Sequence, residues 1–149
     1  MSRGETVGPL DQSAGYLLKR AATALRTAMD TALRPLDLTV PQYSCLEVLA
    51  QRPGLSNAEL ARAVFVTRQS MNLVLRGLQD RGLVTRPATA PQGRALPSTL
   101  TPAGRAQLRA ASGVVRAVQD RMLEPFSAAG RERLVHDLAV CADALTPDE

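Results

Sequence analysis

The sequence is poor in the residues on which most enzymes and metalloproteins depend. Its 149 residues include one histidine, two cysteines, no tryptophan, two tyrosines and two phenylalanines. Lys19 is the only lysine, and no glycine-rich phosphate-binding loop precedes it. His136, Cys45 and Cys141 do not have the spacing of a zinc site. We therefore expect no metal, no cofactor and no enzymatic activity, and we expect both cysteines to be free thiols without a redox role.

Long apolar runs and aromatic clusters are also missing. No run of about 18 apolar residues is present to span a bilayer, and the first ten residues lack the apolar segment of a secretion signal. These absences predict a soluble, cytoplasmic protein with no membrane partner. Two tyrosines and two phenylalanines cannot build the stacking platforms of single-strand binders, so any nucleic-acid partner is expected to be a duplex.

Positive charge is concentrated in the middle of the chain. The net charge is +4, yet residues 56–105 hold seven arginines against two carboxylates, which gives +5, whereas the rest holds 11 basic and 12 acidic residues. A basic segment between neutral flanks favours a surface that faces phosphate groups. The alternative is a solvated polar face with no partner.

Capping and turn residues divide the chain into six helices and one hairpin. Pro35 ends a first helix over 11–33, and two capping boxes, at residues 39–42 and 56–59, begin helices that run to about residues 51 and 64. Thr67 caps a fourth helix that ends before Gly82. Residues 83–86 and 95–100 predict a β-hairpin, and helices over 102–124 and 127–145 follow. The predicted fold class is mainly α with a small β-hairpin.

Apolar residues recur at heptad-like steps in the first helix and in the last two. The stripe of the first helix is Leu18, Ala22, Leu25, Met29 and Ala32, and that of the last is Leu134, Leu138, Cys141 and Leu145. Such stripes favour a homodimer in which these helices form the interface. Packing of the helices on one another within one chain is the alternative.

Two short helices joined by a tight turn and followed by a hairpin are typical of a winged helix-turn-helix. The residues that we expect to contact DNA lie on the second helix, at the two helix caps and at the hairpin tip: Arg68, Gln69, Ser70, Asn72, Arg76, Ser56, Thr67 and Arg94. Amide side chains suit adenine edges, arginine suits guanine or phosphate, and an arginine on the hairpin can reach the minor groove. The simpler alternative is that these residues only solvate or cap the helices.

Three segments resemble the MarR family of bacterial regulators: LSNAELARAVFVTRQSMNLVLRGLQDRGLVTR, the preceding LDLTVPQYSCLEVLA, and ALPSTLTPAG after the hairpin. The most specific parts are L-x-x-R-G-L-V-x-R, at 78–86, and L-T-P-A-G, at 100–104. The resemblance, over about residues 11–145, implies a homodimeric DNA-binding regulator, most often a repressor, with an inverted-repeat operator. It implies a flexible tail at 1–10, a dimerisation helix at 11–38, a winged module at 39–104 and C-terminal dimerisation helices at 105–149.

The resemblance also implies a small, often anionic aromatic effector, bound between the dimer helices and the winged module. We expect Tyr16, Arg20, Tyr43 and Arg86 to line its site, since phenols and guanidinium groups can orient a carboxylate. A regulator without a natural small ligand is the alternative. The hairpin departs from the family pattern, because Gln92 stands where an aspartate usually precedes the wing-tip arginine. This departure leaves open a winged protein-interaction module with weak or no DNA binding.

Overall fold

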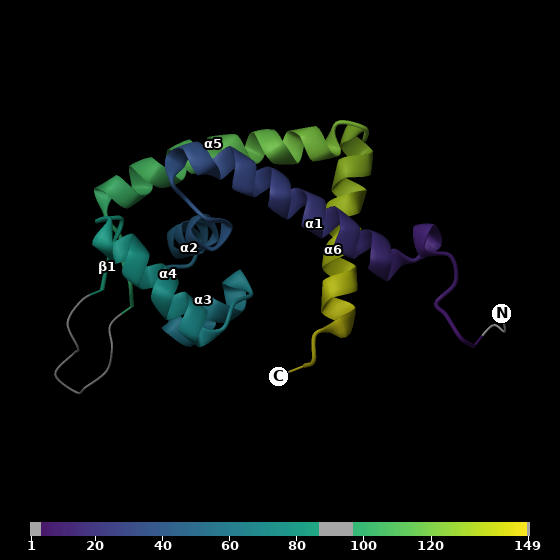
Figure 1. Ribbon diagram of the computed structural model, residues 1–149, viewed down its shortest axis with the longest axis horizontal. Coiled ribbons are helices and arrows are strands. Elements are labelled where there is room, and N and C mark those ends of the chain that lie inside the picture. The colour runs from purple at the N-terminus through teal and green to yellow at the C-terminus, as the bar shows by residue number, and fades with distance from the viewer. Residues whose placement is uncertain (1–3, 87–96, 149) are drawn as a thin grey trace.

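A computed structural model describes residues 4–86 and 97–148 (Figure 1). In this part of the chain six α-helices and two short strands follow one another. They are α1 (Ala14–Leu33), α2 (Val40–Gln51), α3 (Asn57–Val64), α4 (Arg68–Asp80), β1 (Val84–Thr85), β2 (Thr99–Leu100), α5 (Pro102–Leu123) and α6 (Ala128–Leu145), with 3₁₀ turns at Leu10–Gln12 and Arg34–Leu36. The predicted fold class, mainly α with a β-hairpin, is confirmed.

Side-chain caps determine where the helices begin. At α2 and α3 the hydroxyls of Thr39 and Ser56 each accept a hydrogen bond from the amide three residues on, and Gln42 and Glu59 accept one from the cap amide. The bond from the Ser56 amide lowers the pKa of Glu59, because it stabilises the carboxylate. Both predicted capping boxes are therefore confirmed, and so are the predicted caps of α4 and α5.

The prediction is wrong for the start of the first helix and for the length of the strands. Ser13 caps α1, and the residues before it form a 3₁₀ turn, so the helix begins at Ala14 and not at residue 11. The strands pair antiparallel for two residues each, with Val84 opposite Leu100 and Thr85 opposite Thr99. Residues 97 and 98 lie outside β2, and a proline at 97 has no amide with which to extend the ladder.

The core is built from α2, α3, α4 and the hairpin, and it is closed by the end of α1 and by Leu108, Ala111 and Val115 of α5. Eight of its side chains are fully buried: Leu33, Cys45, Leu46, Leu60, Met71, Leu75, Leu78 and Val84. Burying an apolar side chain of this size contributes about 1.5–3 kcal/mol. The helix-turn-helix pair α3 and α4 is thus held as one body with α2 and the hairpin.

A close approach fixes the start of α5 to the end of α4. The Thr101 amide donates to the carbonyl oxygen of Leu83 at 3.1 Å, and the Thr101 hydroxyl donates to that of Gly82 at 2.6 Å. One turn into α5, a Cβ at Gly104 would overlap the Leu83 carbonyl oxygen. Gly82 itself has φ +73°, which favours glycine. The motifs at 78–86 and 100–104 therefore contact each other where α5 begins, and this contact is the joint between α4 and α5.

The helices at the two ends of the chain extend away from the winged module. Figure 1 shows α1 lying along α5 and α6 turning away at the far end of α5. No residue of α6 is buried, and its exposed apolar residues include Val135, Leu138 and Val140. The first turns of α1 also expose Leu17 and Leu18. Packing within the described part of one chain therefore leaves these apolar faces uncovered. Within that part, no helix is both long and apolar enough to cross a membrane.

Candidate nucleic-acid interface

The helix α4 has one face buried in the core and an opposite face open to solvent. Met71, Leu75 and Leu78 are fully buried. At 100° per residue, the direction opposite to these three side chains passes between Gln69 and Leu73. Arg76 lies within about 50° of that direction, and all three outward residues are exposed. The outward face of the second helix of the helix-turn-helix is therefore open to solvent, and of the residues predicted to contact DNA it carries Gln69 and Arg76.

Leu73 lies at the centre of this face and was not among the residues expected from the sequence. Its side chain is 62% exposed although it is a large apolar residue. Only polar residues of the outward arc were predicted to contact DNA. Helical spacing alone could have found Leu73, because it follows Gln69 by one turn and precedes Arg76 by three residues.

Asn72 lies toward α3 and makes a contact that the sequence did not reveal. Its carbonyl oxygen accepts a hydrogen bond from the Asn57 side-chain amide at 3.0 Å, and Asn57 is the first residue of α3. Bidentate recognition of adenine needs both the oxygen and the amide group of asparagine. This contact occupies the oxygen and ties the two helices of the helix-turn-helix together.

The three hydroxyl residues of the predicted site lie at the N-termini of α3 and α4. Ser56 and Thr67 are the caps of these helices. The Thr67 hydroxyl accepts from the Ser70 amide and donates to the Ser70 hydroxyl, each at 3.0 Å. All three side chains are exposed. Helix N-termini carry free amides and a partial positive charge, which suits phosphate groups. Arg68, the first residue of α4, is exposed beside them.

The structure does not bring the four predicted effector residues together within one chain. Tyr16 and Arg20 lie exposed on the first two turns of α1, about 25 Å and about 20 Å along that helix from its end in the core. Tyr43 is buried in α2, and Arg86 is half-buried after β1.

The Tyr43 phenol has polar and charged neighbours. Its burial, and then the nearby Glu47 carboxylate, raise its pKa, while a hydrogen bond with Ser112 and the charge of Arg116 act in the opposite direction.

Two further expectations concern the hairpin tip and the cysteines. Gln92 and Arg94 lie outside the described residues, so the minor-groove contact of Arg94 stays a prediction.

Cys45 is fully buried in α2, and burial raises the pKa of its thiol to about 12, whereas Cys141 is exposed on α6. Among the described residues no group of three or more His, Cys, Asp or Glu could hold a metal ion.

Comparisons with known proteins agree on one family. The model of the MarR family matches residues 36–95. The HTH-type transcriptional repressor Rv2887 of Mycobacterium tuberculosis is 52% identical over 118 residues, which span 79% of this chain and 85% of that protein. The crystal structure of the MarR family protein Rv2887 with salicylic acid has a TM-score of 0.74 at 47% identity, covering 88% of this chain and 97% of that chain. Its structure with DNA has a TM-score of 0.74 at 45% identity, covering 88% and 98%.

Proposed function

Because this chain belongs to the MarR family, we propose that it is a homodimeric transcriptional repressor that binds an inverted-repeat operator in double-stranded DNA and is released by a small anionic aromatic effector. The similarity to Rv2887, which is named as a repressor and has a structure with DNA, supports this proposal. We assign the chain no enzymatic activity, in keeping with a family of regulators. As the partner is chromosomal DNA, we assign it to the cytoplasm.

The single observation that carries the proposal is the outward face of α4. Gln69 and Leu73 lie opposite the buried residues of the helix, Arg76 lies within about 50° of the same direction, and all three are exposed. In the major groove, arginine pairs with guanine, glutamine pairs with adenine, and an apolar side chain meets the thymine methyl group. The side-chain amide group of Asn72 can donate a hydrogen bond to a base at the side of the groove, while its side-chain oxygen accepts one from Asn57 of α3.

The remaining site residues are proposed to position the helix on the DNA backbone. Ser56, Thr67 and Ser70 surround the N-termini of α3 and α4, where phosphates are favoured. Arg68 adds a charge at the same end of α4. Arg94 is proposed to enter the neighbouring minor groove, whose negative potential attracts guanidinium.

The homodimer is supported by the uncovered apolar faces of α1 and α6. An exposed apolar surface of this kind marks an interface, and α6 and the first turns of α1 lie apart from α4 (Figure 1). Two winged modules in one dimer would meet half-sites about 34 Å apart, one turn of the duplex. An operator with twofold symmetry follows from this arrangement.

Selection of bound fragments from random duplex DNA tests the proposal. We expect an inverted repeat with half-sites one helical turn apart, and binding that weakens steeply as salt increases. Arg76→Ala should lower discrimination at one base position in each half-site by about 1–3 kcal/mol, while the matched control Arg133→Ala, on α6, should not. Absence of any duplex binding in dilute salt, together with protein partners that survive high salt, would instead favour a protein-interaction module.

A further inference from the structure

The connection between α1 and α2 is held by side chains of two other helices. Arg81, at the end of α4, donates from its two terminal nitrogens to the carbonyl oxygens of Asp37 at 2.6 Å and Leu36 at 3.4 Å. Gln107, in the second turn of α5, donates its side-chain amide to the same Leu36 oxygen at 2.8 Å. These hydrogen bonds join residues that lie 44, 45 and 71 positions apart in the sequence. We call these four residues the linker cluster.

The backbone that presents these carbonyl groups is itself fixed in place. It forms the 3₁₀ turn Arg34–Leu36 and then a left-handed residue, Asp37, with φ +54°. Leu33 and Leu38, on the two sides of this segment, are buried in the core. The last carbonyl groups of a helical turn have no partner within it, and a guanidinium group can donate to two acceptors at once in a fixed geometry. Arg81 therefore binds one defined arrangement of the linker.

The linker cluster and the joint between α4 and α5 connect three parts of the chain in a closed ring. Arg81 ties the end of α4 to the linker, and Gln107 ties the linker to α5. Thr101, at the start of α5, donates to the carbonyl groups of residues 82 and 83, which directly follow Arg81. Two bodies joined at one place can rotate about it, whereas three bodies joined in pairs hold one another. The ring thus fixes the orientation of α4 relative to the linker and α5.

Arg81 lies in the basic segment of the chain but directs its charge into the protein. Its partners are backbone carbonyl oxygens, and the ion pair found among the described residues joins Arg26 to Asp30 instead. The N-terminus of α4 begins at Arg68, about 20 Å along the helix from Arg81. Arg81 is therefore a positioning residue for α4 and lies at the end of the helix opposite to the proposed phosphate contacts.

We propose that Arg81 and Gln107 determine which spacing between two operator half-sites the dimer accepts. The inference rests on the proposed function, because it concerns a homodimer on an inverted repeat. In that dimer α1 carries part of the interface and α5 leads to α6, which carries the rest. The orientation of α4 relative to the linker and α5 then sets the distance between the two recognition helices.

An operator with altered spacing reveals how rigid this attachment is. One base pair inserted between the half-sites moves one of them by a single step along the duplex and rotates it by about 35°. A dimer whose recognition helices are held rigidly must distort itself or the DNA to bind such a duplex, and that distortion lowers its affinity. A softer attachment lowers the cost. Removal of the linker cluster is therefore expected to relax the spacing preference.

Band-shift titrations of the full chain on the selected operator and on the same operator with one inserted base pair test the inference. The measured quantity is the spacing ratio, the Kd on the lengthened duplex divided by the Kd on the selected one. For the unmodified protein we expect a spacing ratio of about ten or more. Arg81→Met and Gln107→Met keep the length of the side chain but remove the donor, and each should lower the spacing ratio about threefold or more. Arg81→Lys, which keeps a cationic donor, should restore part of the loss.

The matched control Arg52→Met removes an exposed arginine at the end of α2 that belongs to none of these hydrogen bonds. Loss of a positive charge, or of part of the folded protein, changes both affinities by the same factor, so this control should leave the spacing ratio unchanged. Circular dichroism shows that each variant is folded, and Gln107→Met carries the test by itself if Arg81→Met does not fold.

Three results would overturn the inference: a spacing ratio near one for the unmodified protein, an unchanged ratio in the variants that lack a donor, or an equal fall of the ratio in Arg52→Met. Failure of the proposed function appears separately, because the unmodified protein would then select no inverted repeat from random duplex DNA.

Discussion

A single leucine, Leu73, lies exposed at the centre of the outward face of α4, the face that we propose meets the DNA bases. Leu73 has no hydrogen-bonding group, so its natural partner in the major groove is the thymine methyl group. Burying one methyl or methylene group contributes about 0.8 kcal/mol, close to a fourfold change in affinity. We predict that replacing the contacted dT by dU in the selected operator weakens binding of the unmodified protein by about this factor, and that Leu73→Ala removes the sensitivity.

Band-shift titrations of both proteins on both duplexes measure this effect as a double-mutant cycle. Leu73 is 62% exposed, so the substitution leaves the core unchanged. Equal sensitivity of the two proteins to dU at every thymine of the half-site would show that Leu73 does not contact a methyl group.

Burial makes Cys45 chemically inert. With its thiol pKa at about 12, only about one molecule in ten thousand is ionised near pH 8, and the thiolate is the reactive form. In a Cys141→Ser background, we predict no modification of the native protein by a thiol reagent over minutes, and modification of one thiol in concentrated guanidinium. With an aromatic disulfide as the reagent, the absorbance of the aromatic thiol that it releases measures the modification of the native protein and of the unfolded protein. Fast labelling of the native protein would contradict the burial of Cys45.

Helical spacing in the sequence predicts which residues of α4 face the solvent. It does not predict side-chain contacts between residues that are far apart along the chain. Gln69 and Arg76 are exposed as helical spacing predicts. The contact between Asn72 and Asn57 spans 15 residues and depends on how α3 crosses α4, which no local pattern specifies. Tyr16 and Tyr43 were expected in one effector site with two arginines, and that site stays a prediction, since within one chain Tyr16 is exposed on α1 and Tyr43 is buried in α2.

Among the elements, the start of α5 is the most constrained, because it meets the Leu83 carbonyl without room for a side chain. We predict that Gly104→Ala lowers the free energy of unfolding by about 1–3 kcal/mol, since backbone must move to admit the methyl group. In the same helix a Cβ at Gly113 would have nothing within 4 Å, so Gly113→Ala should raise stability by about 0.5–1 kcal/mol. Urea denaturation followed by circular dichroism compares the two. If both substitutions stabilise the protein, the start of α5 has room for a side chain after all.

The starts of four helices were predictable from their local caps, whereas the start of α1 was not, although Ser13 caps it in the same way. A hydroxyl and an amide three residues on suffice to begin a helix, which explains why the starts of α2, α3, α4 and α5 agree with the sequence. The strands were overestimated because β-pairing needs a partner across the hairpin, and the pairing of β1 with β2 stops after Thr85 and Thr99.

For the whole molecule, the apolar face of α6 predicts the oligomeric state. Placing a carboxylate on that face would bury an unpaired charge in a dimer, at a cost of several kcal/mol. We predict that Leu138→Glu shifts the protein from dimer to monomer in sedimentation velocity, with a dimer Kd raised at least a hundredfold. The neighbouring Asp137→Asn changes charge alone and should leave the dimer intact. A dimer that survives Leu138→Glu would show that the interface lies on another face.

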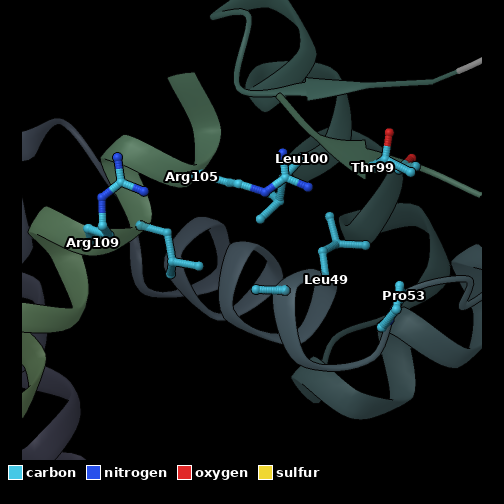
Figure 2. A pocket seen from close by; sticks show the side chains of 9 residues that line it. Leu49, Pro53, Thr99, Leu100, Arg105 and Arg109 are labelled. Carbon is cyan, nitrogen blue, oxygen red and sulfur yellow. The ribbon is translucent and has the colours of Figure 1, made fainter. Parts of the chain in front are cut away.

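A cavity of about 390 Å³ between the end of α2, β2 and the first turns of α5 (Figure 2) could not have been predicted from the sequence. Its walls come from residues 49–53 on one side and residues 98–109 on the other, and only the packing of α2 on α5 brings them together. The heptad stripe of the last helix is visible in the sequence. Whether another helix of the same chain covers this stripe could be learned only from the structure, in which α6 has no buried residue.

The joint at Gly104 has a mechanical consequence for the way the protein responds to a ligand. Because α5 is one unbroken helix of 22 residues, it behaves as a stiff lever about 33 Å long. A tilt of roughly 6° at one end displaces the other by about 3.4 Å, the rise of one base pair along the duplex. A tilt of that size is therefore large enough to take the two recognition helices of a dimer out of phase with their operator.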